Sequence, residues 1–510
     1  MLGFLLVLVL VFVSGVRAID NAFCASASTR DADFFPPSAR VAADVSRDGS
    51  SEAFVAPSIA FNVTYSRSFK VVRTRSIVPG IPEKTYVLVQ CGVARPTTDV
   101  DGRAFATDAQ FFDVPVTSAA TALTVTIGFL DELGLRDSVD AVDPGSVHAP
   151  CWQRDEETGA MLGADATANW NDSANSYDVS PAWVSALPAS VTMVLTDRFG
   201  TGKTDTAKDV NFDASEAPLG MLDRLEYVKF LSLFFNKESA ANAYYFDQVT
   251  RWNEMKDRIA YAQSRGRIPK TFTCAWIENE SYGTDVSFKV SFEKFEKDIC
   301  SGVGLTTFIP SDVASGATAK RYSTLAEFHV AIANVNVIFD RTYYYQPSAT
   351  TKKDVYASLG FDQPSAAGLK VLTSEGWILR LDKRVSDGDP LVTHSFAVEG
   401  LDWFESTFSH PALVLSDLSR LIWLDGVVGI DPPQTGCARF FRNMKVTDNV
   451  LITSAADCPA YEAARVAGTC SKQLADQSIT LNNLYGYRSP AKAVSVTASV
   501  MIAFVVFSMA

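Results

Sequence analysis

Hydrophobic and polar positions alternate along this chain between two spacings, one typical of strands and one typical of helices. Near the amino end, residues 59–65 and 85–90 are rich in β-branched and aromatic side chains. A Pro-Gly-Ile-Pro turn at 79–82 lies between them. This pattern predicts a β-rich segment ahead of the main fold.

The next third of the chain predicts strands separated by a helix. Apolar runs predict strands at 112–117, 139–142 and 190–197. A helix is expected over 122–133, ended by Gly134. Residues 153–190 are rich in Ala, Ser and Asn and predict a polar surface insertion. Strands that alternate with helices imply parallel βα units and an α/β fold.

A long helix should follow, with Asn236 as its N-cap and Glu238 in its first turn. Its apolar residues recur at three- and four-residue steps: Ala241, Tyr245, Val249, Trp252, Met255 and Ile259. After it, strands are predicted at 272–277, 336–340 and 377–381, and a helix at 411–424.

The expected fold class is therefore α/β, with two Rossmann-like lobes joined by one long interlobe helix. A β-rich N-terminal addition and a disulfide-stapled C-terminal appendage flank the lobes. The expected segments are a signal peptide (1–18), the β-rich addition (19–110), the first lobe (111–235), the interlobe helix (236–264), the second lobe (265–425), the appendage (426–488) and a membrane tail or anchor signal (489–510).

Composition narrows the partners. The chain has 45 Lys+Arg against 58 Asp+Glu, a net charge of −13, which argues against binding nucleic acid or an anionic membrane surface. Charged residues make up 20% and hydrophobic residues 47%, which excludes a largely disordered protein. The 4 histidines are scattered along the sequence, so we expect no metal centre.

Both ends of the chain carry targeting signals. An apolar run at 2–13, followed by Val16-Arg17-Ala18, predicts a secretory signal peptide. Residues 493–510 are apolar or small and predict a glycolipid-anchor signal, with Gly486 or Ser489 at the attachment site. A single transmembrane span is the alternative for this tail. Either tail places the protein on a cell-surface or endomembrane face of the secretory pathway.

The remaining sequence features agree with an extracellular protein. Three N-glycosylation acceptors occur, at Asn62, Asn171 and Asn279. The 8 cysteines allow up to four disulfides, and none forms a CxxC pair. We expect Cys151 to form a disulfide, and Cys437, Cys458 and Cys470 to staple the appendage.

The order of these elements resembles a known family, the class III periplasmic solute-binding proteins. These receptors hand siderophores, haem or cobalamin to ABC importers. The similar stretches are FDVPVTSAATALTVTIGFLDELGLRDSVDAVD (112–143), PLGMLDRLEYVKFLSLFFNKESAANAYYFDQV (218–249), STLAEFHVAIANVNVIFD (323–340), SEGWILRLDKR (374–384) and DWFES (402–406). The β-rich addition, the insertion and the C-terminal part depart from the bacterial pattern. They resemble a eukaryotic branch that includes the algal cobalamin acquisition proteins, which implies cobalamin as a transported ligand rather than a catalytic cofactor.

Residue types at the expected strand ends suggest the ligand site. Cobalamin is large, flat-faced and near neutral, so it should select aromatic walls and a few polar donors. The candidate ligand-binding residues are Thr117, Ser118, Trp152, Trp276, Glu278, Tyr343, Trp403, Phe404 and Glu405. A ferric siderophore or haem is the alternative ligand. An anionic siderophore would need several arginines, and Arg341 is the one well-placed candidate.

An enzyme is the more remote alternative. The sequence contains no GxSxG or HExxH motif, and the run from Gly200 to Thr204 lacks the spacing of a phosphate-binding loop. Glu278 and Glu405 could form an acid–base pair of a secreted hydrolase, but nothing in the sequence sets their separation. An adhesive surface protein is disfavoured because there are no repeats. We therefore expect a non-catalytic binding protein that delivers its ligand to an uptake transporter or enters by endocytosis.

Overall fold

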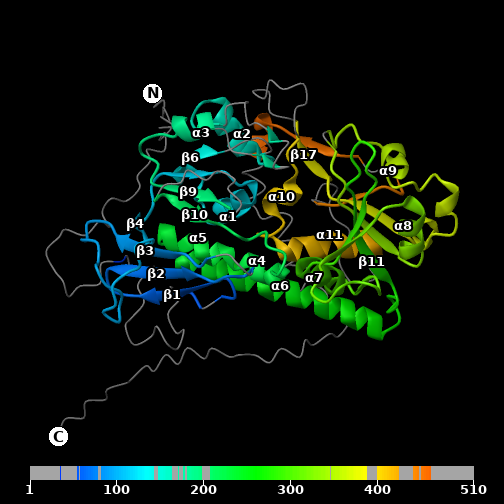
Figure 1. Ribbon diagram of the computed structural model, residues 1–510, viewed down its shortest axis with the longest axis horizontal. Coiled ribbons are helices and arrows are strands. Elements are labelled where there is room, and N and C mark those ends of the chain that lie inside the picture. The colour runs from blue at the N-terminus through cyan, green and yellow to red at the C-terminus, as the bar shows by residue number, and fades with distance from the viewer. Residues whose placement is uncertain are drawn as a thin grey trace, which may run out of the picture.

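The computed structural model places two α/β lobes and a smaller sheet along one long helix (Figure 1). It describes residues 35, 54–56, 58–78, 82–142, 147–163, 170–171, 176–177, 181–197, 207–344, 346–387, 399–423, 440–446 and 449–460. The predicted signal peptide and membrane tail lie outside these residues, as does the run from Gly200 to Thr204.

A four-stranded sheet begins the described chain, in the order β1-β2-β3-β4. Its strands are β1 (Phe61–Tyr65), β2 (Phe69–Thr74), β3 (Thr85–Gln90) and β4 (Gln110–Val114). The predictions of β1 and β3 are confirmed, whereas β2 was not predicted. The prediction of a first-lobe strand at 112–117 was wrong about where the strand ends and about which sheet contains it. The strand β4 stops at Val114 because Pro115 has no N–H to continue the ladder. It pairs in parallel with β3 and so belongs to the N-terminal sheet instead of the first lobe.

Helix α5 (Tyr227–Phe235) packs against this sheet and also against the first lobe. Edge-to-face ring contacts join Phe230 to Phe61 and Tyr86 of the sheet, with centroids 5.3 and 6.1 Å apart. Phe230 also contacts Phe212 of the first lobe at 6.4 Å. The β-rich addition and the first lobe therefore share one hydrophobic core.

The first lobe contains a parallel sheet in the order β10-β9-β5-β6. Its strands are β5 (Ala119–Thr121), β6 (Val139–Val142), β9 (Met193–Thr196) and β10 (Asp209–Asn211). Its helices are α1 (Ile127–Glu132), α2 (Pro150–Glu157) and α3 (Pro181–Ala186), and the insertion also holds the short pair β7 (Trp170–Asn171) and β8 (Ser176–Tyr177). The predictions of β6, β9 and a helix before Gly134 are confirmed.

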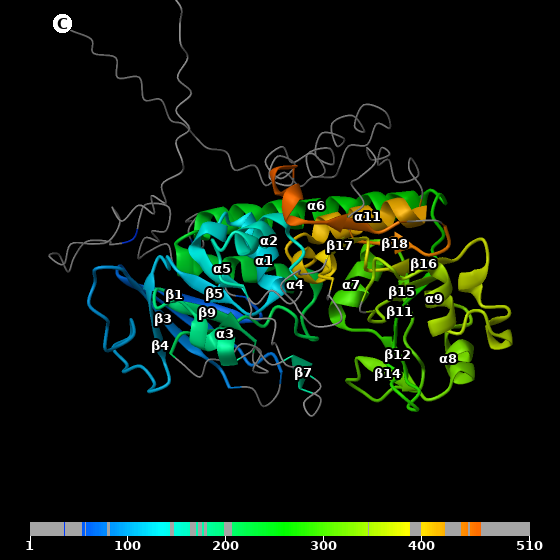
Figure 2. The ribbon, with the colours of Figure 1, turned by 90° about the horizontal axis from the view of Figure 1, so that it is seen from above.

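The interlobe helix is α6 (Glu238–Ser264), which follows α4 (Met221–Leu225) and α5. Figure 2 shows α6 running along one edge of the molecule, past both lobes. Its existence and extent match the prediction, but its start does not. Asn236 has a left-handed backbone, with φ of 55°, and ends α5, while Lys237 is the N-cap of α6.

A hydrogen bond to a buried lysine explains the position of the Asn236 side chain. Its Oδ1 accepts a hydrogen bond from the buried Lys70 ammonium at 2.8 Å, and Lys70 also pairs with Glu238 at the start of α6. The side chain that was expected to cap the helix instead ties the N-terminal sheet to it.

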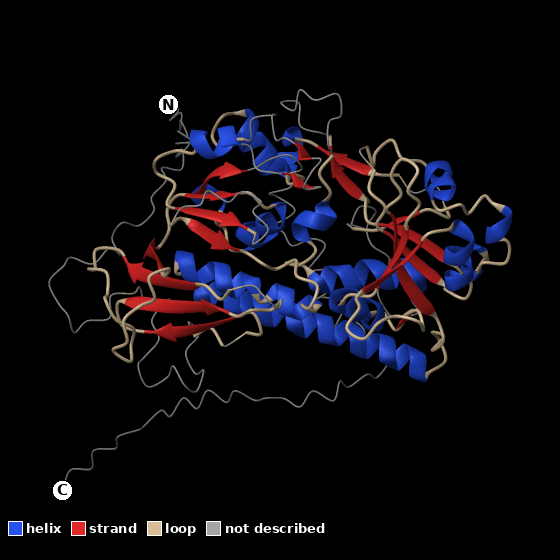
Figure 3. Cartoon of the chain, in the orientation of Figure 1, coloured by secondary structure: helices blue, strands red, loops and turns tan. Residues whose placement is uncertain are grey.

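The second lobe has a mixed sheet in the order β14-β12-β11-β15-β16-β18, with the short β13 (Thr306–Thr307) beside β11 (Figure 3). The strands are β11 (Thr273–Asn279), β12 (Phe288–Ser291), β14 (Ala319–Tyr322), β15 (Val337–Asp340), β16 (Trp377–Arg380) and β18 (Arg442–Asn443). The helices are α7 (Lys294–Gly302), α8 (Leu325–Ile332), α9 (Lys352–Ser358), α10 (Asp402–Ser406) and α11 (Pro411–Trp423). The predictions of β11, β15, β16 and α11 are confirmed, and both faces of the central strands are covered.

Two disulfides are described, Cys274–Cys300 within the second lobe and Cys151–Cys458. The disulfide predicted for Cys151 is confirmed. The expectation that Cys458 staples the appendage is also confirmed, because this disulfide joins the C-terminal segment to the first lobe. Cys437 and Cys470 lie outside the described residues.

Candidate functional site

The carboxyl ends of β11 and β15 meet at one edge of the second-lobe sheet. These strands are parallel neighbours, with Ile277 opposite Asp340. The backbone N–H of Arg341 donates to the carbonyl of Ile277 at 2.8 Å, and Thr342 Oγ1 accepts from the backbone N–H of Asn279 at 3.0 Å. Because ligands of open α/β sheets bind outside carboxyl strand ends, we take this edge as the candidate ligand face.

Charged side chains on this edge, which we call the second-lobe edge, are paired with one another. Lys289 Nζ lies 3.2 Å from both Glu278 and Glu280, and Arg321 Nε lies 2.7 Å from Glu280. Arg224 reaches across from α4 to Glu293 at 3.6 Å. The edge therefore offers compensated charge rather than a field of one sign.

Arg341 directly follows Asp340, the last residue of β15, and a buried carboxylate compensates it. Its Nη1 donates to Glu296 Oε1 at 2.6 Å, while its side chain stays 25% exposed and Glu296 is fully buried. Glu296 Oε2 accepts from Ser291 Oγ and from the backbone N–H of Glu293, both at 2.7 Å. Burial would lower the pKa of Arg341, but the carboxylates of Glu296, Glu278 and Glu293 more than offset this and raise it. Arg341 thus stays protonated, and the carboxylate of Glu296 balances its charge.

Of the residues predicted for the site, Glu278 and Tyr343 lie at this edge. Glu278 is half-buried near the end of β11, and Tyr343 is 50% exposed in the loop after β15. Thr117 and Ser118 lie elsewhere. They precede β5, so they are at its amino end rather than the carboxyl end that the sequence suggested, and Ser118 Oγ donates to Asp140.

The three predicted tryptophans lie in hydrophobic cores. Trp152 is on α2 with no exposed surface, and its Nε1 donates to Asp131 at 2.8 Å. Trp276 stacks on Phe339 with centroids 4.4 Å apart and lies 5.8 Å from Trp403. The strand was expected to end at Ile277, but β11 continues to Asn279, which puts Trp276 in the middle of a strand covered on both faces.

Residues 403–405 were expected in a loop, and this was wrong because they form helix α10. Successive residues of a helix point in different directions. Trp403 is 5% exposed and packs in the second-lobe core, while Phe404 is 51% exposed. Glu405 is buried and points to the first lobe, where its Oε2 accepts from the backbone N–H of His148 at 2.7 Å and of Ala149 at 3.2 Å.

Glu405 belongs to a polar junction between the lobes that sequence reasoning missed. In this interlobe junction, His410 Nε2 lies 2.9 Å from Glu132 Oε1, and His148 Nδ1 lies 3.8 Å from Asp402 Oδ1. Helix α1 approaches α10 closely at Gly128, where a Cβ would lie 2.7 Å from the carbonyl oxygen of Glu405. The sequence signal was two histidines and several acids around apolar runs, which does not reveal pairs more than 250 residues apart.

Glu405 should make the junction pH-dependent. Burial raises its pKa well above the ordinary value, and Asp402 and Asp131 add to this, while the two backbone N–H groups oppose it. A raised pKa means that the folded state prefers the protonated acid. The contribution of Glu405 to stability is therefore greatest in acid and is lost as pH rises through that pKa.

We expect Glu405→Gln, which keeps an acceptor but cannot ionise, to become more stable relative to the wild type as pH rises from 5.5 to 8.5. Thermal unfolding of both proteins across this range measures the difference. The other ionisable side chains of the junction are present in both proteins: His148, His410, Glu132, Asp131 and Asp402. A stability difference that does not change with pH would contradict this assignment.

A serine–histidine–carboxylate chain also occurs in the junction. Ser409 Oγ lies 2.8 Å from His410 Nδ1, whose ring reaches Glu132 through Nε2. Ser409 has no exposed surface, and its Oγ donates to the Ser406 carbonyl at 2.9 Å. A Cβ on Gly128 would lie 2.5 Å from this Oγ, so no substrate could reach it. These contacts support a structural role.

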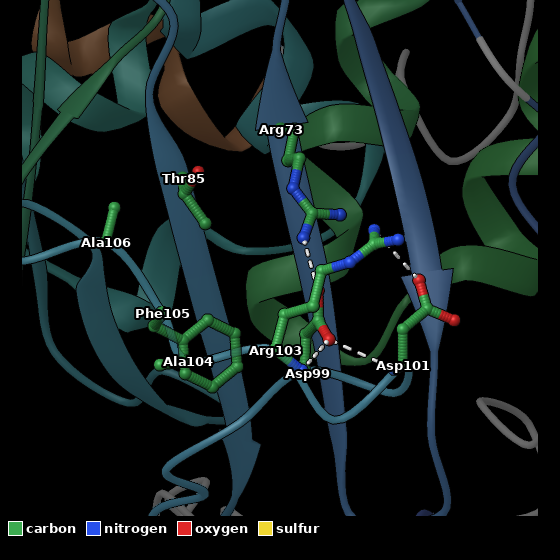
Figure 4. A pocket seen from close by; sticks show the side chains of 8 residues that line it. All are labelled: Arg73, Thr85, Asp99, Asp101, Arg103, Ala104, Phe105 and Ala106. Atoms are coloured by element: carbon green, nitrogen blue, oxygen red, sulfur yellow. Dashed lines mark hydrogen bonds and ion pairs between the residues drawn. The ribbon is translucent and has the colours of Figure 1, made fainter.

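A hollow of about 330 Å³ lies on the N-terminal sheet (Figure 4). Arg73 and Asp99 pair at 3.1 Å across it, and Asp99 Oδ1 accepts from the backbone N–H groups of Asp101 and Arg103. Arg103 pairs in turn with Asp101 at 3.5 Å. The polar groups of this hollow bind each other, and it carries none of the predicted residues.

The glycosylation acceptors differ in their surroundings. Asn62 is half-buried on β1, and Asn171 lies in β7. The Nδ2 atom of Asn279, to which a glycan would attach, donates to the carbonyl and hydroxyl of Ser358 at 2.8 and 3.1 Å. A glycan at Asn279 would therefore displace both hydrogen bonds.

Within the described ranges, no three histidine, cysteine or acidic side chains are grouped so as to hold a metal ion. Across the same part of the chain, no helix combines the length and apolar character needed to cross a membrane.

Comparison with known proteins returns structures but no sequence relatives. No protein-family model matches the chain, and no curated protein matches it. A periplasmic heme binding protein of Pseudomonas aeruginosa is 14% identical and covers 60% of this chain and 92% of its own, with a TM-score of 0.37. HutB, the periplasmic heme binding protein of Vibrio cholerae, is 12% identical over 60% of this chain and 98% of its own, with a TM-score of 0.38.

A third structure, an ABC-type Fe3+-hydroxamate transport system protein of Saccharomonospora viridis, is 15% identical over 53% of this chain and 86% of its own, with a TM-score of 0.37. The likeness to periplasmic solute-binding proteins that the sequence suggested is thus found among solved structures. With TM-scores of 0.37 to 0.38, this likeness carries no argument about the present chain, and the ligands of those proteins are their own.

Proposed function

We propose that this chain is a non-catalytic receptor that captures cobalamin at the second-lobe edge for uptake. The observation that carries this proposal is the set of paired charges around Arg341, beside the exposed ring of Tyr343. Compensated charge favours a large, near-neutral ligand with a flat face, since an unpaired anion would find no uncompensated cation there. We further propose a membrane-tethered location in the secretory pathway, based on the apolar segments at both ends of the sequence.

Haem is the second candidate, and one observation favours it. Tyr343 is 50% exposed, and a tyrosine oxygen is one of the side-chain groups that bind haem iron. Arg341 lies two residues away and could approach a propionate, but only by sharing its charge with Glu296. A ferric siderophore of high negative charge fits this edge less well.

Direct binding tests the proposal. We expect the chain from residue 19 to about 485 to bind cyanocobalamin saturably at micromolar concentration or below in calorimetry. Tyr343→Ala should weaken binding about 10-fold, equivalent to ~1.4 kcal/mol, because a flat ligand loses a ring contact. Phe246→Ala removes a ring that is 63% exposed on α6 and serves as the matched control, with unchanged affinity.

The variant Tyr343→Phe separates the two ligands, because it keeps the ring and removes the oxygen. Cyanocobalamin binding should survive this change. Haemin binding through the phenol should be lost, together with its absorbance change. Absence of saturable cyanocobalamin binding to the wild type would refute the cobalamin assignment.

A further inference from the structure

The C-terminal segment, described at 440–446 and 449–458, connects the two lobes a second time. It starts in the core of the second lobe, where Phe440 and Phe441 are buried and β18 pairs with β16. It continues as β19 (Leu451–Thr453), which pairs in parallel with β17 (Arg384–Ser386). A short 3-10 helix at Ala455–Asp457 then contacts α2 of the first lobe, and Cys458 is bonded to Cys151. We call this segment the strap.

The end of the strap holds the stretch of first lobe that Glu405 also holds. Thr453 Oγ1 lies 3.0 Å from His148 Nε2 and 3.3 Å from the carbonyl of His148. The carboxylate of Glu405 accepts hydrogen bonds from the N–H groups of His148 and Ala149, which lie three and two residues before Cys151. A short piece of the first lobe is therefore bound by a covalent bond, by a hydroxyl and by a buried acid, all from the other side of the junction.

The strap and α6 attach the lobes on different sides of the junction. Figure 1 shows α6 along the lower side of the molecule, and α2 with the orange end of the strap along the upper side. A hinge at α6 alone would let the upper sides of the lobes separate. The disulfide joins residues 307 positions apart in sequence and has no exposed surface at either cysteine, so it closes the structure into a covalent ring. Opening about one attachment is thus resisted by the other.

We propose that the strap fixes the separation of the lobes, so that the second-lobe edge stays at a set distance from the first lobe and binding proceeds without lobe closure. The expected effect on ligand binding rests on the proposed function, whereas the fixed distance between the lobes does not. Cys151, Cys458, Thr453 and Glu405 are positioning residues in this scheme. They set the distance between the lobes and do not touch the ligand.

The mechanical part is tested without ligand. Fluorophores placed through unnatural amino acids at the exposed positions Asp137 and Lys353 report the interlobe distance by single-molecule energy transfer. We expect one narrow distribution in the wild type and a broader, shifted one in Cys151→Ser/Cys458→Ser. The matched control is Cys274→Ser/Cys300→Ser, which removes a disulfide inside the second lobe and should leave the distribution unchanged. Identical distributions in the wild type and the strap variant would overturn the proposal.

Two further measurements complete the test. If the strap variant fails to fold, Thr453→Val/Glu405→Ala in the intact disulfide background removes the hydroxyl and the acceptor for the N–H groups of His148 and Ala149. It should still broaden the distribution, and an unchanged distribution would count against the strap. For whichever of cyanocobalamin or haemin the wild type binds, the strap variant should bind about 10-fold more weakly if only about a tenth of it keeps the competent geometry. If neither ligand binds the wild type, the proposed function fails while the distance measurement still decides the strap.

Discussion

Replacing Asp382 with Ala is expected to lower the free energy of unfolding by about 3–5 kcal/mol, because two buried arginines lose a shared partner. Asp382 has no exposed surface and accepts from Arg380 Nε at 2.6 Å and from Arg442 Nη2 at 2.8 Å. Arg380 also donates to Asp340 at 2.6 Å and to the carbonyl of Thr342 at 3.1 Å. Chemical denaturation of the wild type and the variant measures the loss.

The matched control is Asp312→Ala, since Asp312 pairs with Lys320 at the surface. Exposed pairs of this kind contribute about 0–1 kcal/mol, so a loss as large as that of Asp382→Ala would show that burial is not the cause. The result bears on function as well. Arg380 holds the carbonyl of Thr342, which precedes Tyr343, so the buried network supports the loop of the proposed ligand face.

Trp403→Ala should destabilise the protein by about 3–5 kcal/mol, whereas Phe404→Ala should change its stability by less than about 0.5 kcal/mol. Trp403 fills the second-lobe core against Trp276 and lies 5.4 Å from Phe441 of the strap. Phe404, the next residue, is 51% exposed. Denaturation curves of the two variants make the comparison within one helix. Equal stability of both variants would mean that Trp403 is not a core residue and could serve the ligand directly.

The fold was accessible from the sequence because its main elements have strong local signals. The apolar stripe of α6, the β-branched runs of β3 and β15, and the glycine after α1 each predict one element without information from elsewhere in the chain. The predictions that failed relied on a local sequence rule that another feature of the chain overrode. Pro115 ended β4 early, and Asn236 was drawn into the buried contacts of Lys70 instead of capping α6.

The sequence predicted only part of the candidate site. Glu278 and Tyr343 lie at a carboxyl strand edge, as expected, because strand ends follow from apolar runs. The sequence did not reveal that three of the predicted site residues are core residues: Trp152, Trp276 and Trp403. A tryptophan near a strand or helix end is equally compatible with a hydrophobic core and with the wall of a ligand site. The length of β11 and the helical turn of α10 determine which way these rings point.

The sequence by itself determined the succession of strands and helices, the two-lobed α/β class and the net negative charge, because each depends on local spacing or on simple counts. Only the tertiary structure decided that Glu296 neutralises Arg341, that Glu405 binds the first lobe, and that Cys458 is bonded to Cys151. These pairs are 45, 257 and 307 residues apart. Contacts at such distances arise from packing of the whole chain, and no local pattern encodes them.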